Sequence, residues 1–291
     1  MSPFLSHNPL MPYTYTNGIV TFYEDTGDGE PVVLIHGHSL DGRMWGYQVP
    51  ALVEAGFRTV RHDVRGHGRT MVSPEGYTWE NYARDLAELL DHLSGERPAA
   101  QSLDVPAAHV VGLSMGGGIA LRFALDYPER VLSLTLVDSA LPGFGYSDAI
   151  GNTIQALRAA VEAEGVWPAF QRLWLTHPLF DGVRARPEAY ALVEEMVRGF
   201  QAPEYVRRGG EAAEPEAAPA PPIIDRLGEI SARTLVVVGE NDIDDFRLIA
   251  EILAATIPNA RQVVLPGCGH MVPMKDPDAF NRLLLDFLPG H

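Results

Sequence analysis

The sequence predicts an α/β fold built on a mainly parallel sheet with helices on both faces. The first reason is that short apolar runs alternate with helical patterns from residue 31 to residue 138, as in parallel sheets joined by right-handed crossovers. The second is that the run over 31–35 is an uninterrupted apolar stretch. Such a run indicates a strand that is buried on both faces of a parallel sheet.

Eight strands are expected in chain order. Residues 13–16 and 19–24 flank Asn17-Gly18, a favoured two-residue hairpin turn, so they should form an antiparallel pair at one sheet edge. The other strands are expected over 31–35, 57–63, 109–113, 131–137, 234–238 and 262–265. Helices are expected over 44–55, 78–93, from Ser114 to Tyr127, 245–256 and 277–288.

The alternation of strands and helices breaks between residues 141 and 225. Helical patterns and many aromatic residues replace it there, which predicts a helical cap inserted after the sixth strand. We therefore expect a core domain made of residues 1–140 and 226–291, with residues 141–225 as the cap. Within the cap, residues 209–222 are rich in Ala, Pro and Glu, a composition that predicts a flexible segment.

Ser114 lies at the centre of a Gly-x-Ser-x-Gly pattern that runs from Gly112 to Gly116. A strand pattern precedes it and a helical pattern follows it, which is the context of a nucleophile elbow. This turn lifts the serine hydroxyl clear of the backbone, and a Cβ at either glycine would collide across it. The start of the following helix can stabilise negative charge near the serine. We expect a nucleophilic serine, although a Gly-rich turn with an incidental serine also fits the pattern.

Composition and charge exclude several classes of protein. The net charge of −16 repels nucleic acids and anionic membrane surfaces. No run of about 18 apolar residues could span a bilayer, and residues 1–20 do not resemble a secretory signal. The single cysteine, Cys268, excludes an internal disulfide and gives no metal-binding cluster. We expect a cytoplasmic monomer or homodimer with no metal, cofactor, nucleic-acid or membrane partner.

Five features in this order resemble the α/β-hydrolase family. They are His36-Gly37, the turn over 63–68, the Ser114 pattern, the loop over 239–242 and Gly269-His270. The resemblance covers residues 13–140 and 225–290, and it implies an α/β-hydrolase fold, in which an eight-stranded, mostly parallel sheet carries a helical cap between strands six and seven.

The sequence around Ser114 is similar to the serine esterase, lactonase and cofactor-free haloperoxidase (perhydrolase) branch of that family. The carbon–carbon hydrolases of aromatic degradation usually have Asn before the serine, where this chain has Leu113. Dehalogenases and epoxide hydrolases use aspartate as the nucleophile, and Ser114 argues against both.

The family order of serine, acid and histidine maps onto Ser114, Asp242 and His270. A serine hydroxyl needs an imidazole as base and a carboxylate that orients the imidazole. Asp242 keeps the family position after its strand, and Asp138, at the end of the sixth strand, is its main rival. The resemblance assigns the oxyanion-binding backbone N–H groups to His38 and Met115. The residues expected to support the site structurally are His36, Gly37, Gly112 and Gly116.

These residues predict a serine hydrolase that cleaves a small, neutral, apolar ester or lactone through an acyl-enzyme, with perhydrolase activity as a side reaction. The apolar cap predicts an apolar pocket, and the net charge of −16 hinders anions. The alternative substrate is an enol-lactone or ring-cleavage product that bears a carboxylate, which would need a cation such as Arg43, Arg122 or Arg172. A protein of another class, a receptor that binds its ligand without turnover, also fits the fold.

Overall fold

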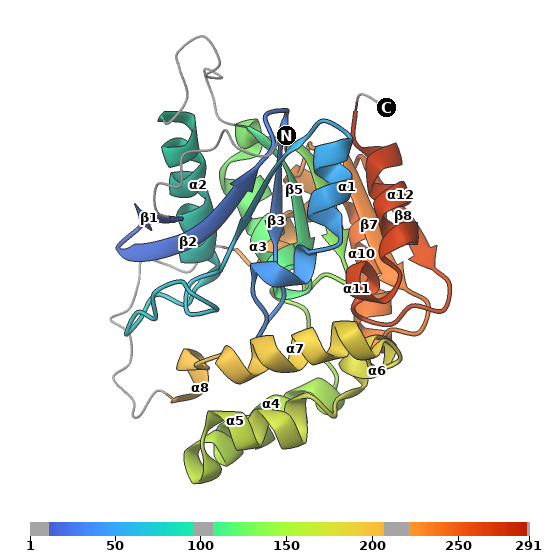
Figure 1. Cartoon of the computed structure of the whole chain (residues 1–291). Helices are drawn as coiled ribbons and strands as arrows, with labels where there is room; N and C mark the ends of the chain where they lie inside the picture. The colour runs from blue at the N-terminus through green and yellow to red at the C-terminus, as the bar shows by residue number, and fades with distance from the viewer. Residues whose placement is uncertain (1–11, 96–106, 207–220, 290–291) are drawn as a thin grey trace, which may run out of the picture.

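The computed structural model describes residues 12–95, 107–206 and 221–289. An eight-stranded sheet runs through its centre with the spatial order β1-β2-β4-β3-β5-β6-β7-β8 (Figure 1). The strands are β1 (Tyr13–Thr16), β2 (Ile19–Thr26), β3 (Pro31–Ile35), β4 (Arg58–His62), β5 (Ala108–Leu113), β6 (Val131–Val137), β7 (Thr234–Gly239) and β8 (Ala260–Leu265). The predicted eight-stranded α/β-hydrolase fold is confirmed.

The strand directions follow from the connections. β1 and β2 are antiparallel and join through Asn17 and Gly18, whose φ angles of 41° and 82° suit the tight hairpin turn that this pair predicts. β2 is also antiparallel to β4, and every other neighbouring pair is parallel. The carboxyl ends of β3, β5, β6, β7 and β8 therefore meet at one edge of the sheet, where ligands of open α/β sheets bind.

Helices cover both faces of this sheet. α1 packs against α12, and α2 packs against α3 (Figure 1). The core helices are α1 (Gln48–Glu54), α2 (Trp79–Gly95), α3 (Met115–Asp126), α9 (Ile223–Arg226), α10 (Asp244–Thr256), α11 (Val272–Lys275) and α12 (Pro277–Phe287). Every residue of β5 and β7 is buried between these layers, which explains why both strands are mostly apolar.

One predicted helix, over 44–55, is wrong in its extent. The structure has a 3-10 turn, η1 (Gly42–Trp45), followed by the shorter helix α1. Pro50 lies in the first turn of α1, and this is the part of a helix where proline's missing N–H and fixed φ are tolerated. A continuous helix from residue 44 would place Pro50 in its interior, where the ring would clash with the preceding turn.

Between β6 and β7 the chain forms the helices that we call the cap helices (Figure 1). These are α4 (Asp148–Glu164), α5 (Val166–Ala169), α6 (Asp181–Arg184), α7 (Pro187–Gly199) and α8 (Pro203–Val206), with the π-helical turn η4 (Phe170–Trp174). They gather at one end of the sheet. The flexible segment predicted over 209–222 falls almost wholly outside the described residues. Among those described, no helix has both the length and the apolar character needed to cross a bilayer.

Candidate active site

Ser114 lies in a strained turn between β5 and α3. Its φ and ψ angles are 52° and −116°, a region that residues with a side chain rarely occupy and that is typical of functional sites. Hydrogen bonds hold this turn to the neighbouring strand: Ser114 N–H donates to the Val137 carbonyl, and the Ser114 carbonyl accepts from Ala140 N–H, each at 2.9 Å. The strain is therefore imposed by the sheet.

The two glycines around Ser114 are required by close backbone contacts. A Cβ on Gly112 would lie 2.2 Å from the Gly116 carbonyl oxygen, and a Cβ on Gly116 would lie 2.3 Å from the Ile35 carbonyl oxygen. Real Cβ atoms do not approach backbone atoms so closely, and the backbone here cannot rotate away. Gly112 and Gly116 thus allow α3 to begin directly beneath the serine, as the sequence pattern predicts.

His270 and Asp242 follow β8 and β7, two neighbouring parallel strands. His270 Nδ1 lies 2.8 Å from Asp242 Oδ2, and both side chains are buried. Their loops are joined by a 2.7 Å hydrogen bond from Asn241 N–H to the Cys268 carbonyl. A Cβ on Gly239 would lie 2.3 Å from the Gly269 carbonyl oxygen. Close packing of these two loops therefore sets the distance between the carboxylate and the imidazole.

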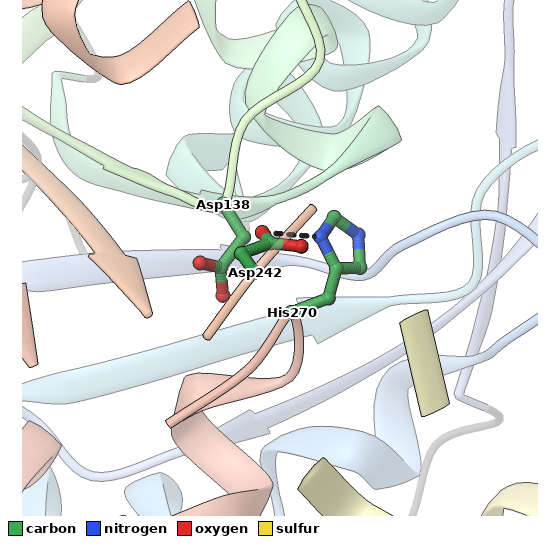
Figure 2. A group of neighbouring side chains, drawn as sticks. All are labelled: Asp138, Asp242 and His270. Carbon is green, nitrogen blue, oxygen red and sulfur yellow. Dashed lines mark hydrogen bonds and ion pairs between the residues drawn. The ribbon is translucent and has the colours of Figure 1, made fainter. Parts of the chain in front are cut away.

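Asp138, the rival acid, lies beside this pair at the end of β6 (Figure 2). It is fully buried, and its carboxyl group accepts from Gly239 N–H at 2.9 Å and from Val272 N–H at 3.3 Å. Figure 2 shows the imidazole of His270 bonded to Asp242 and not to Asp138. The other two acids of the Asp242 loop point elsewhere, since Asp244 is exposed and Asp245 accepts from the Ser147 hydroxyl at 2.7 Å.

The surroundings of Asp138 disfavour the charged form of its carboxyl group. Burial, and after it the nearby Asp242 carboxylate, raise the pKa of Asp138 well above its usual range. Two like charges this close in a buried site cannot both ionise easily. One potential ligand atom from each of Asp138, Asp242 and His270 lies within 4.8 Å of the other two. A metal ion bound by all three residues would displace the hydrogen bonds described above. The arrangement therefore favours a neutral Asp138.

The predicted oxyanion residues flank Ser114. His38 and Met115 line the same cavity as Ser114, and within the described residues neither backbone N–H is bonded to another backbone or side-chain group. His36 supports the turn before His38, because its Nδ1 bonds the Gly37 carbonyl at 2.8 Å and its Nε2 accepts from Val64 N–H at 2.9 Å. Two free N–H donors beside a serine can stabilise a negative oxygen.

Ser114 and His270 line a cavity of about 280 Å³ beneath the cap helices. No hydrogen bond joins Ser114 to His270 in the described part of the chain, and such bonds often form only when substrate aligns the groups. The cap contributes apolar side chains to this cavity, which include Ile150, Ile154, Trp174 and Phe180. Other cap aromatics, such as Phe170 and Phe200, are buried and pack against each other. Phe200 also stacks on His67, with ring centroids 4.6 Å apart, so these rings join the cap helices to the loops below them.

None of the three arginines considered for an anionic substrate lines this cavity. Arg43 pairs with Asp41 at 2.9 Å and with Glu195, Arg122 pairs with Glu80 and Asp126 at 2.6 Å each, and Arg172 pairs with Glu164. Each guanidinium is thus already paired with a carboxylate.

Two lining residues had no signal in the sequence. Phe246, on α10, packs its ring 4.2 Å from the His270 ring. Glu204, on α8, belongs to a cap segment without a recognisable motif. Both positions depend on packing between segments far apart in the chain.

Cys268 lies two residues before His270 and is buried. Burial raises the pKa of its thiol to about 11. A thiol that stays protonated is a weak nucleophile, so the side chain fits the packing role that the sequence suggests.

Comparisons with known proteins identify the family of this chain. Residues 32–283 match the alpha/beta hydrolase family. The chain is 31% identical to a 2-hydroxy-6-oxononadienedioate/2-hydroxy-6-oxononatrienedioate hydrolase of Comamonas testosteroni, covering 91% of this chain and 89% of the relative. It is 30% identical to the non-heme chloroperoxidase CPO-A1 of Kitasatospora aureofaciens, covering 94% and 98%. A thermophilic esterase structure from Thermogutta terrifontis is 32% identical, with a TM-score of 0.75 and coverage of 95% and 96%. The chain therefore belongs to the alpha/beta hydrolase family.

Proposed function

We propose that this protein is a cofactor-free serine hydrolase that cleaves a small, neutral ester or lactone. The observation that carries the proposal is the strained Ser114 turn in one cavity with His270, whose Nδ1 is bonded to a buried Asp242. In this proposal residues 141–225 act as the cap over a core made of residues 1–140 and 226–291.

The reaction would proceed in two halves. Ser114 Oγ attacks the acyl carbon while His270 Nε2 takes its proton, and the same imidazole then protonates the leaving alcohol. Asp242 holds the imidazole by Nδ1 and stabilises its charged form. The N–H groups of His38 and Met115 bind the oxygen that becomes negative. Water, activated by His270, then releases the acid, and hydrogen peroxide in place of water would release a peracid as a side reaction.

The walls of the cavity favour a neutral substrate. Among the described residues that line it there is no arginine or lysine, and most are apolar or aromatic. A carboxylate in this cavity would lose its hydration without gaining a cationic partner, which is unfavourable. The names of two relatives imply substrates of different charge. The Comamonas testosteroni enzyme is named for a dioate, whereas the Thermogutta terrifontis protein is named as an esterase.

The second candidate is therefore a carbon–carbon hydrolase acting on a carboxylate-bearing ring-cleavage product. The 31% identity to the dioate hydrolase favours it, whereas Leu113 before the serine and the lack of a lining cation oppose it.

The test compares hydrolysis of a neutral chromogenic ester with that of a ring-cleavage dienoate of similar size. We expect the wild type to hydrolyse the ester, with Ser114→Ala lowering turnover to the background rate. Faster turnover of the dienoate than of every neutral ester would move the second candidate to first place. Binding of ester without turnover by the wild type would instead indicate a receptor.

A further inference from the structure

Glu204 is the only Asp, Glu, Lys or Arg among the described residues that line the cavity. It lies on α8, one of the cap helices, and its side chain is 28% exposed. One of its carboxylate oxygens, Oε2, is buried and has no hydrogen-bond partner in the described part of the chain. Oε2 is thus closed off from the cavity, and a ligand there would meet the remaining part of this polar side chain on a mostly apolar wall. A polar group on such a wall gains from a hydrogen-bond donor on the ligand.

The other oxygen of Glu204 is held in place by the oxyanion loop. Oε1 lies 3.4 Å from His38 Nδ1, and Tyr205 OH lies 3.2 Å from His38 Nε2. Burial lowers the pKa of His38 and raises the pKa of Tyr205, so the imidazole is neutral and the phenol keeps its proton. The phenol then donates to Nε2, which places the imidazole proton on Nδ1, facing Glu204. The His38 imidazole therefore orients this side chain.

We propose that Glu204 selects the substrate by accepting a hydrogen bond from it, so that the preferred substrate is a neutral ester or lactone with an O–H or N–H donor on its apolar part. The inference rests on the proposed hydrolase function and narrows its substrate class. The surrounding walls argue for a neutral donor, because an ammonium group would lose its hydration against mostly apolar side chains. The same carboxylate repels a substrate carboxylate in a cavity of low polarity.

The test uses nitrophenyl esters of straight-chain acids that end in methyl, hydroxyl, ammonium or carboxylate, over a series of chain lengths. At one chain length, the wild type should hydrolyse the hydroxyl ester with a kcat/KM about tenfold above that of the methyl ester, as for one hydrogen bond to a charged acceptor. The carboxylate ester should be the poorest substrate at every length.

Two substitutions separate charge from hydrogen bonding. Glu204→Leu should abolish the preference for the hydroxyl ester, measured as the ratio of kcat/KM for the hydroxyl ester to kcat/KM for the methyl ester within the variant, so that any loss common to both esters through His38 cancels. Glu204→Gln keeps an acceptor but removes the charge, so it should keep part of the preference while raising kcat/KM for the carboxylate ester by about tenfold. Glu162→Gln is the matched control, because Glu162 is an exposed acid on α4 outside the cavity, and all its preferences should equal those of the wild type.

The outcomes distinguish this inference from the function beneath it. Two results would contradict the role of Glu204 while leaving the proposed hydrolase function intact. In the first, the wild type cleaves simple esters but does not prefer the hydroxyl ester. In the second, Glu204→Leu retains that preference. A preference for the ammonium ester over the hydroxyl ester would overturn the neutral class of substrate. If the wild type cleaves none of the esters, the proposed function itself fails.

Discussion

The floor and the wall of the cavity are built in different ways. The floor consists of the loops that carry Ser114, Asp242 and His270, and the wall consists of the lining residues from the cap helices. In the floor, backbone atoms approach so closely that only glycine fits at Gly112, Gly116 and Gly239. In the wall, apolar side chains from separate helices meet, and their contacts can shift as one side chain replaces another.

The comparison shows why one site can combine fixed chemistry with variable recognition. A floor set by backbone contacts keeps the reacting groups within the small tolerances that catalysis needs. A wall set by side-chain packing can change its shape without moving the floor. Substitutions should therefore affect the rate of the chemical step when they lie in the floor and the choice of substrate when they lie in the wall.

The largest effect is expected from the groups that react. Ser114→Ala and His270→Ala should each lower ester turnover by on the order of 10⁴-fold, because neither group works without the other. Steady-state kinetics on folded protein, checked by circular dichroism, measures this. The double variant should be little slower than either single variant, and multiplicative losses would show that the two residues act independently.

A second test separates the two buried acids. Asp242→Asn should lower kcat by on the order of 10³-fold to 10⁴-fold by permitting the wrong histidine tautomer. Asp138→Asn should cost less than about tenfold in kcat, because Asp138 is not bonded to His270. Its main cost should be in stability, because the amide can accept only one of the two backbone N–H groups that the carboxyl oxygens accept. The kinetic constants of both variants decide between them. A damaging Asp138→Asn with a mild Asp242→Asn would mean that the acid has been assigned to the wrong strand.

A third test compares floor with wall directly. Gly239→Ala should lower kcat by about 10-fold to 100-fold, because the new methyl group must push the Asp242 and His270 loops apart. Ile154→Val, which shortens a wall residue, should change kcat/KM by less than about threefold. Both variants should be assayed with the same neutral ester. Equal losses in the two variants would contradict the division into floor and wall.

The smallest expected effect is a pH dependence of the free energy of unfolding, caused by His62 on β4. Burial, and after it His36, lower the pKa of His62 to about 3. In the unfolded chain His62 takes up a proton near pH 6.5, whereas in the folded chain it stays neutral until the pH approaches 3. Its contribution to the free energy of unfolding is therefore complete above pH 6.5 and is lost as the pH falls towards 3. Urea unfolding across this range should show a steeper loss for the wild type than for His62→Leu. Parallel curves would exclude His62 as the cause.

The sequence predicted the floor well because the floor depends on local patterns. Strand, glycine and helix signals around Ser114 lie within a short stretch, and His270 follows a strand in a loop bounded by glycine. In the sequence Asp138 remains a rival to Asp242 as the acid, because both residues follow neighbouring strands. The structure distinguishes them, because Asp242 is hydrogen-bonded to His270 and Asp138 is not.

The wall could be predicted only in its general character. An aromatic cap indicates an apolar pocket, yet the same pattern does not separate Trp174, which lines the cavity, from Phe170, which is buried in the cap. Glu204 reaches the cavity through contacts between α8 and the loop after β3, and no local spacing encodes such a long-range contact. The break between η1 and α1 has a local cause, because Pro50 is tolerated only near the start of a helix and so restricts where α1 can begin.

The contact of Tyr205 with His38 also has a kinetic consequence. In the proposed mechanism the backbone N–H of His38 binds the reacting oxygen, while its side chain lies 3.2 Å from the hydroxyl group of Tyr205 on the cap helix α8. This contact links the wall to the floor, so a displacement of α8 would be transmitted to the proposed oxyanion donor. Tyr205 is therefore expected to be an exception to the division between floor and wall. Release of the cap from His38, as in Tyr205→Phe, should accordingly lower kcat as well as raise KM.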